Sequence, residues 1–167
     1  MIKGYEIERK FLVVMPDIQK LDVRRKLDII QTYLVNGENG SQRRVRRIEE
    51  CGEVKYFYTE KLFLTGITRK EMEYEINRQE YERLIGQARE DYVPIHKMRY
   101  CFDYRTQLFE LDVYPFSESL AVMELELDSE EQEIIFPENV EVIKEITGNP
   151  AYSNARIATD GAFPINN

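Results

Sequence analysis

Residues 5–12 read Tyr-Glu-Ile-Glu-Arg-Lys-Phe-Leu, or YEIERKFL, and the fold is predicted from the alternation of charged and apolar side chains that begins here. Its charged side chains, Glu6, Glu8 and Lys10, stand at every second position, with the apolar Ile7 and Phe11 between or beyond them. Successive side chains of a β-strand point to opposite faces, so the stretch predicts a strand with one charged and one apolar face. For a single strand taken alone, the simplest interpretation is that the charged face meets water.

The same alternation recurs along the chain, and within each later segment the charged positions carry one sign. The residues that share a face are Arg44 with Arg46, Lys55 with Lys61, Glu71 with Glu73 and Glu75, Lys97 with Arg99, Glu110 with Asp112, and Glu124 with Glu126. The positions of opposite parity are mostly apolar, as Val45, Leu111 and Leu125 illustrate. Each of these later predicted strands therefore has a charged face that is either basic or acidic.

This sorting by sign argues against ordinary solvated faces. Residues two apart on a strand are separated by ~6.6 Å, and two like charges at that distance repel by roughly 2–3 kcal/mol at an effective dielectric constant of 20. Turned inward around one cavity, the same side chains suit a polyanion that binds together with cations. Carboxylates bind hard divalent ions through oxygen, and Arg and Lys bind phosphate oxygens.

The overall composition excludes several other classes of protein. The chain has 167 residues, 43% of them hydrophobic, with 23 basic and 31 acidic side chains and a net charge of −8. The acidic excess argues against a nucleic-acid-binding protein. Two distant cysteines and one histidine form no zinc or disulfide pattern. The charged start MIKGYEIERK and the absence of a long apolar run predict a cytoplasmic protein with no membrane partner.

Alternation and turn signals predict an arrangement made mainly of strands. The predicted strands are residues 5–14, 29–35, 41–50, 53–64, 68–76, 96–104, 107–114 and 120–128. Helices are predicted over residues 16–27, after Asn77 with Glu80 completing a capping box, and from Pro137 through Val140, Ile143 and Ile146. A short helical turn is expected at residues 153–158. We predict one domain over residues 1–167, mainly β (α+β), folded as an eight-stranded antiparallel barrel.

Several of these segments resemble one known family. Glu6–Lys10 (EIERK) is similar to the ExExK signature of the CYTH domain, found in the triphosphate tunnel metalloenzymes. The segments that follow in the order and spacing of that family are RVR (Arg44–Arg46), TEK ending at Lys61, RKEMEYE (Arg69–Glu75), HKMRY with Lys97 and Arg99, FELDVY with Glu110 and Asp112, MELEL with Glu124 and Glu126, and EITGNPAYSN (Glu145–Asn154). The resemblance covers nearly the whole chain.

The resemblance implies a closed barrel with a polar tunnel, helices packed outside and a triphosphate bound within. The charged face of YEIERKFL would then line the tunnel, while Ile7 and Phe11 would face an outer helical layer. It implies that Lys10, Arg44, Arg46, Lys61, Lys97 and Arg99 bind the phosphates. It implies that Glu6, Glu8, Glu73, Asp112, Glu124 and Glu126 hold Mg²⁺ or Mn²⁺, with Glu6, Glu8 and Lys10 forming the catalytic set.

The activity expected from the resemblance is metal-dependent hydrolysis of a small triphosphate, first of all inorganic tripolyphosphate. The alternatives are a class IV adenylate cyclase, a thiamine triphosphatase and a protein that binds polyphosphate or nucleotides without catalysis. The lack of Trp weighs against thiamine stacking, although 11 Tyr residues are present. The acidic set weighs against simple polyanion binding, because carboxylates would repel the ligand. The resemblance is also compatible with a homodimer.

Overall fold

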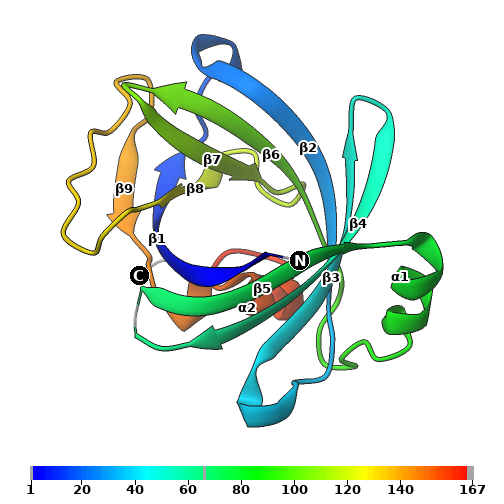
Figure 1. Ribbon diagram of the computed structural model, residues 1–167. Coiled ribbons are helices and arrows are strands. Elements are labelled where there is room, and N and C mark those ends of the chain that lie inside the picture. The colour runs from blue at the N-terminus through cyan, green and yellow to red at the C-terminus, as the bar shows by residue number, and fades with distance from the viewer. Residues whose placement is uncertain (1, 66, 165–167) are drawn as a thin grey trace.

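The computed structural model describes residues 2–65 and 67–164, and its strands form one antiparallel sheet closed on itself. The sheet has nine strands in the order β5-β4-β3-β2-β6-β7-β8-β1-β9, and an additional pairing of β5 with β1 closes the barrel (Figure 1). Eight strands therefore make the barrel, and β9 is added along β1. The predicted eight-stranded antiparallel barrel is confirmed.

The elements follow the order of the sequence. The strands are β1 (Ile2–Val14), β2 (Asp22–Tyr33), β3 (Gln42–Glu50), β4 (Glu53–Phe63), β5 (Thr68–Ile76), β6 (Ile95–Tyr104), β7 (Gln107–Val113), β8 (Leu120–Glu126) and β9 (Val142–Glu145). The helices are α1 (Arg78–Ile85) and α2 (Asn154–Asp160), with 3₁₀ turns at Ile18–Lys20, Glu38–Gly40 and Pro150–Tyr152. None of the helices in the described ranges is long and apolar enough to cross a membrane.

Strand β1 changes partners half-way along its length. Residues 2–7 pair with β5, residues 8–14 pair with β8, and residues 11–13 also pair with β9. The wall between β1 and β5 is therefore hydrogen-bonded over the first half of β1 only. The chain that follows β9 lies beside the second half, where Ile146 N donates to Lys10 O at 2.9 Å.

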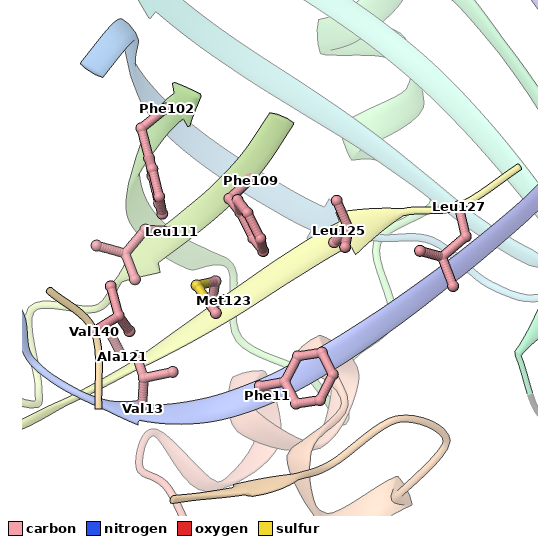
Figure 2. Close-up of a cluster of buried hydrophobic side chains, with 10 residues drawn as sticks. All are labelled: Phe11, Val13, Phe102, Phe109, Leu111, Ala121, Met123, Leu125, Leu127 and Val140. Atoms are coloured by element: carbon pink, nitrogen blue, oxygen red, sulfur yellow. The ribbon is translucent and has the colours of Figure 1, made fainter. Parts of the chain in front are cut away.

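The main apolar cluster lies on the outer face of β1, β6, β7 and β8 (Figure 2). Its buried members are Phe11, Val13, Phe102, Phe109, Leu111, Ala121, Met123, Leu125, Leu127 and Val140. Ile7, Ile134 and Val142 pack against it. The apolar face of the opening stretch therefore faces outward, as expected, and leaves the charged face for the interior.

The cover over this outer face is an extended segment rather than a helix. The helix predicted from Pro137 is wrong, because the chain there forms loops and then β9. Val140, Ile143 and Ile146 stand three residues apart, as on a helix, yet Ile143 is 42% exposed. Val140 and Val142 contribute to the outer cluster instead, and pairing with β1 fixes the segment as a strand. Tertiary pairing here overrides a weak helical period.

The helix predicted over residues 16–27 is also wrong. Only Ile18–Lys20 form a 3₁₀ turn, and β2 begins at Asp22. Leu27, Ile29, Gln31 and Tyr33 alternate along one face of β2, and this strand pairs with β3 on one side and β6 on the other. Pairing with β6 along residues 22–31, joined by β3 from Asp28 onward, fixes β2 as a strand despite its polar first half.

The two helices occupy different places. Helix α1 lies outside the barrel, where Leu84 packs with Val45 and Tyr58, and Glu80 N donates to the capping Asn77 Oδ1 at 2.8 Å. Helix α2 confirms the helical turn predicted near residues 153–158. Its Ala155, Ile157 and Ala158 pack at one end of the barrel, against inward-facing Leu12, Tyr33, Ile95, Tyr114 and Val122. One helix thus covers an outer face and the other closes one end.

Candidate functional site

The charged faces of the strands surround one cavity inside the barrel. Residues directly opposite in neighbouring strands share a face, and the register aligns Glu8 with Glu126, Lys10 with Glu124, and Lys61 with Glu71. The cavity is lined by Glu6, Glu8, Lys10, Arg44, Arg46, Lys61, Glu71, Glu73, Arg99, Glu110, Glu124, Leu125, Glu126 and Asn154. The barrel thus gathers ten of the twelve predicted site residues around it.

The cations of this cavity lie beside carboxylates in a mixed network. Lys61 Nζ lies 3.5 Å from Glu6 Oε1 and 3.7 Å from Glu71 Oε2. Arg46 Nη2 donates to Glu73 Oε1. The Lys61–Glu6 pair joins β4 to β1 across the β5–β1 pairing, so this part of the network depends on closure of the barrel.

Arg69 is a further interior cation that the sequence prediction did not assign. Its Nη1 donates to Glu8 Oε1 at 2.9 Å, and Lys10 Nζ lies 4.0 Å from the same oxygen. Arg69 is buried and stands on the face of β5 that carries Glu71 and Glu73. The alternation in the sequence could have identified Arg69 as an inward-facing residue, because it is two residues before Glu71 and has the same parity.

The two predicted site residues outside the cavity lining are Lys97 and Asp112. Both are 1% exposed, and Lys97 Nζ donates to Asp112 Oδ2 at 2.8 Å. Arg99 donates to the same carboxylate from Nε at 2.7 Å and from Nη2 at 2.9 Å. Burial alone would raise the pKa of Asp112, but the charges of Arg99 and Lys97 outweigh it and hold that pKa well below its ordinary value. Burial lowers the pKa of Lys97 to about 8, against the opposing effect of Asp112.

Buried polar atoms without hydrogen-bond partners are confined to the barrel interior in the described part of the chain. They are Glu6 Oε1, Gln31 Oε1, Arg44 Nε, Arg46 Nε, Thr59 Oγ1, Arg69 Nε and Glu71 Oε2. Leaving such groups unpaired costs free energy, so native proteins almost always provide them with a partner. Here the arginines offer donors to an anion, and the two glutamates offer acceptors to a cation. The interior therefore has the chemistry of a site for both kinds of ligand.

On the acidic side of the cavity several carboxylates lie close together. Burial and then the neighbouring charges of Glu6, Glu110, Glu71 and Glu8 raise the pKa of Glu126. Burial also raises the pKa of Glu110, opposed by Arg99. Carboxylate oxygens are the donors that hard divalent ions prefer, so this donor set fits Mg²⁺ or Mn²⁺. Among residues 2–65 and 67–164, no three such side chains are already drawn together as a metal site.

A second cavity opens beside the end of β4 and the C-terminal segment. Glu8, Lys10, Arg44 and Lys61 line both cavities. The outer one adds Arg69, Tyr33, Tyr92 and the stretch from Ile146 to Ala155. This is where β1 has left β5, so the change of strand partner places an entrance next to the basic residues.

Strand β2 contributes an uncharged wall that the sequence prediction did not include. Leu27 and Ile29 form a small interior apolar cluster with Cys101 and Ile48. Further along, Gln31 Nε2 donates to Tyr33 Oη at 2.8 Å, and Tyr33 lines the outer cavity. No like-charged pair marks the inward face of this strand, so the pattern of like charges could not identify it. The charged lining is therefore one-sided.

Known proteins resemble this chain over nearly its full length, although no protein-family model matches it. An inorganic triphosphatase from Acetivibrio thermocellus is 32% identical over 155 residues, which cover 92% of this chain and 93% of that protein. The crystal structure of the inorganic triphosphatase NE1496 matches with a TM-score of 0.58 at 31% identity, covering 92% of this chain and 94% of that one. The PH1819 protein from Pyrococcus horikoshii shares the fold, with a TM-score of 0.58 at 19% identity over 75% of this chain and 80% of that chain.

Proposed function

Because the chain belongs to the inorganic triphosphatase family, we propose that it hydrolyses a small triphosphate, inorganic tripolyphosphate, inside the barrel. The membership agrees with the resemblance seen in the ordered sequence motifs. The observation that carries the proposal is the charged interior itself, where buried arginine nitrogens and buried glutamate oxygens lack hydrogen-bond partners. A polyanion bound together with a divalent cation would satisfy both.

The basic residues bind the substrate in this proposal. Lys10, Arg44, Arg46, Lys61 and Arg99 line the cavity, and Arg69 extends the set toward the entrance. Arginines provide planar, bidentate contacts to phosphate oxygens, whereas lysines act as compact point charges. Together they neutralise the substrate and align its terminal phosphoryl group. Such positioning and charge stabilisation supply most of the catalysis in phosphoryl transfer.

The carboxylates would hold the divalent ion. The residues proposed for this are Glu6, Glu8, Glu124 and Glu126, supported by Glu73, all of which line the cavity. When bound, Mg²⁺ or Mn²⁺ would act as a Lewis acid and neutralise the charge that develops on the substrate. Glu73 pairs with Arg46, so it also orients a phosphate-binding side chain.

The hydrolysis then needs a water molecule placed in line with the bond to be broken. The water oxygen attacks the terminal phosphorus, the bond to the bridging oxygen breaks, and phosphate and pyrophosphate leave. An interior carboxylate orients the water by accepting its hydrogen bond, while the basic side chains hold the leaving pyrophosphate. Lys10 and Arg44, which line both cavities, connect this centre with the entrance.

The test is phosphate release from tripolyphosphate, ATP and thiamine triphosphate, each with Mg²⁺ and with Mn²⁺. We expect tripolyphosphate to give the highest kcat/KM and excess EDTA to abolish turnover. Formation of cyclic AMP and pyrophosphate from ATP would instead identify an adenylate cyclase. Tight binding of tripolyphosphate without release of phosphate would identify a non-catalytic binding protein.

A further inference from the structure

Lys97, Asp112 and Arg99 form a buried triad at the edge of the cavity. The carboxylate of Asp112 receives three charged hydrogen bonds, one from Lys97 at 2.8 Å and two from Arg99 at 2.7 and 2.9 Å. Of the three side chains only Arg99 lines the central cavity. Lys97 and Asp112 lie behind it, each 1% exposed.

The hydrogen bonds fix the direction of the Arg99 guanidinium group. Its Nε and Nη2 edge is held by Asp112, so Nη1 and the remaining Nη2 hydrogen point away from that carboxylate. Among the described residues, Nη1 donates to Glu110 Oε2 in a long hydrogen bond of 3.4 Å, and Nη2 lies 3.5 Å from Glu124 Oε2. Arg99 therefore presents an aligned donor edge to the cavity, and Asp112 is the residue that aligns it.

If Arg99 were aligned by the Asp112 carboxylate alone, it would bind an anion more weakly. An Arg–Asp pair has no net charge, so an arginine held in this way would attract a polyanion weakly. The triad contains two cations and one anion, and its net charge is therefore +1. The triad therefore contributes one positive charge to the cavity wall, beside the carboxylates of Glu110 and Glu124, while the orientation of Arg99 is fixed.

We propose that Asp112 and Lys97 are positioning residues: Asp112 aligns Arg99 toward the triphosphate, and Lys97 cancels the charge of Asp112. This proposal rests on the proposed function, because it needs a polyanionic ligand. It replaces the roles that family resemblance implies for these two residues, metal ligand for Asp112 and phosphate ligand for Lys97. Both oxygens of Asp112 accept hydrogen bonds from Lys97 and Arg99, and Lys97 lies behind the cavity wall.

A double-mutant cycle separates the two assignments. The net charge of the triad is +1 in the wild type, zero in Lys97→Met, +2 in Asp112→Asn and +1 in the double variant. Calorimetric titration of tripolyphosphate without metal at pH 7 should show affinity lost by about tenfold, roughly 1.4 kcal/mol, in Lys97→Met. The double variant should bind more tightly than Lys97→Met. If Lys97 were a direct phosphate ligand, Lys97→Met would lose far more than tenfold, and the double variant would stay far weaker than the wild type although both triads carry a charge of +1; that result would overturn the proposal.

Asp112→Asn provides a second test through its effect on the metal. We expect its kcat to fall because Arg99 is no longer aligned, while its affinity for Mn²⁺, measured by electron paramagnetic resonance, stays at the wild-type value. A large loss of Mn²⁺ affinity would make Asp112 a metal ligand and contradict the positioning role. Lys26→Met and Asp22→Asn, on exposed positions of β2, remove the same charges outside the cavity and serve as controls.

Unfolding measurements keep the proposal testable if a variant is unstable or binds nothing. Asp112→Asn leaves two cations buried together, so urea should unfold it at a lower concentration than the wild type. Removing Lys97 as well should recover part of that loss, whereas additive losses would overturn the triad. Failure of the folded wild-type chain to bind tripolyphosphate would instead contradict the proposed function, and the unfolding cycle would still decide whether Lys97 compensates Asp112.

Discussion

Glu8 and Arg44 face the same cavity, yet their surroundings suit them to opposite roles. Glu8 accepts a hydrogen bond from Arg69 at 2.9 Å and lies 4.0 Å from Lys10 Nζ, so it balances two cations. Arg44 keeps its Nε without a partner among the described residues. Both cations contact Glu8 at Oε1, which leaves Oε2 as the oxygen for a metal, while the Nε of Arg44 suits a phosphate oxygen. Substitution of each residue separates the two roles.

Glu8→Gln keeps the size of the side chain but removes a negative charge from the proposed metal site. We expect turnover of tripolyphosphate to fall by two or more orders of magnitude, since metal activation contributes several kcal/mol to the transition state (roughly 10²-fold per 2.7 kcal/mol). Tripolyphosphate should still bind without metal, and more tightly, because Arg69 is released from its carboxylate. Steady-state phosphate release and calorimetry measure both effects. Wild-type turnover in this variant would contradict the role of Glu8.

Arg44→Ala should behave differently, because it removes a contact to the substrate in both ground and transition states. We expect weaker tripolyphosphate binding together with lower kcat/KM, measured by the same two methods. Substitutions on a solvated surface usually change stability by less than about 0.5 kcal/mol, so Lys26→Ala on the outer face of β2 is a matched control. Unchanged binding in Arg44→Ala would show that this side chain does not contact the phosphates.

The raised pKa of Glu126 leads to a prediction of how the stability of the protein depends on pH. Burial and neighbouring carboxylates raise its pKa above the ordinary value of 4.5, so the folded state holds a proton that the unfolded chain has released. The stability that this group contributes is present below pH 4.5 and is lost as pH rises through the raised pKa. The Tm of the metal-free protein should therefore fall as the pH rises above 4.5. Glu126→Gln should flatten this slope, and an equally steep slope in that variant would contradict the assignment.

At the scale of the elements, alternation in the sequence was sufficient to predict most strands. The hairpin around Cys51-Gly52 forms as expected, with φ of 52° and 82° at these two residues. Both positive angles belong to a tight two-residue turn whose twist suits the flanking strands. The strands that the alternation describes least well are β2, whose first half pairs only with the distant β6, and β9, whose partner β1 lies far away in the sequence. Their pairing is a property of the closed barrel and leaves little local signal.

The candidate site was predictable to a similar extent. Like-charged pairs identified the residues that line the cavity, because parity and sign are both local. Parity could not show that Asp112 would be enclosed by Lys97 and Arg99, since that depends on the register of β6 against β7, in which Arg99 lies opposite Asp112. The pairing of Arg69 with Glu8 across β5 and β1 has the same origin. The local sequence pattern thus predicts which residues line the cavity, whereas the strand register determines which of them pair with one another.

Helix α1 offers a test of an element that the sequence predicted correctly. Asn77 Oδ1 accepts a hydrogen bond from one free N–H of the first turn, that of Glu80, at 2.8 Å. Asn77→Ala should lower the free energy of unfolding by about 1 kcal/mol, whereas Asn77→Ser, which keeps a capping oxygen, should cost much less. Urea denaturation midpoints measure the difference. Equal losses in both variants would mean that packing of the amide, rather than its hydrogen bond, stabilises the start of α1.

At the scale of the whole molecule, the barrel reverses the usual distribution of side chains. Its main apolar cluster lies on the outer face of the sheet, under the segment that carries Ile134, Val140 and Val142. The interior holds the buried charges, and several of their polar atoms have no partner. The outer clusters and the closing helix α2 must therefore stabilise the fold against repulsion inside it. A ligand that balances the interior charges should relieve this repulsion.

The consequence is a large stabilisation by the proposed ligands. A ligand that binds only the folded state adds about 2.7 kcal/mol of stability at a hundredfold excess over its dissociation constant, which raises the Tm of a chain of this size by about 5–10 °C. Tripolyphosphate with Mg²⁺ should produce this shift in differential scanning fluorimetry, and Arg44→Ala should reduce it. Sodium chloride at equal ionic strength screens charges without occupying the cavity, so it should raise the Tm by much less. An equal shift with chloride would assign the effect to screening and argue against an interior polyanion site.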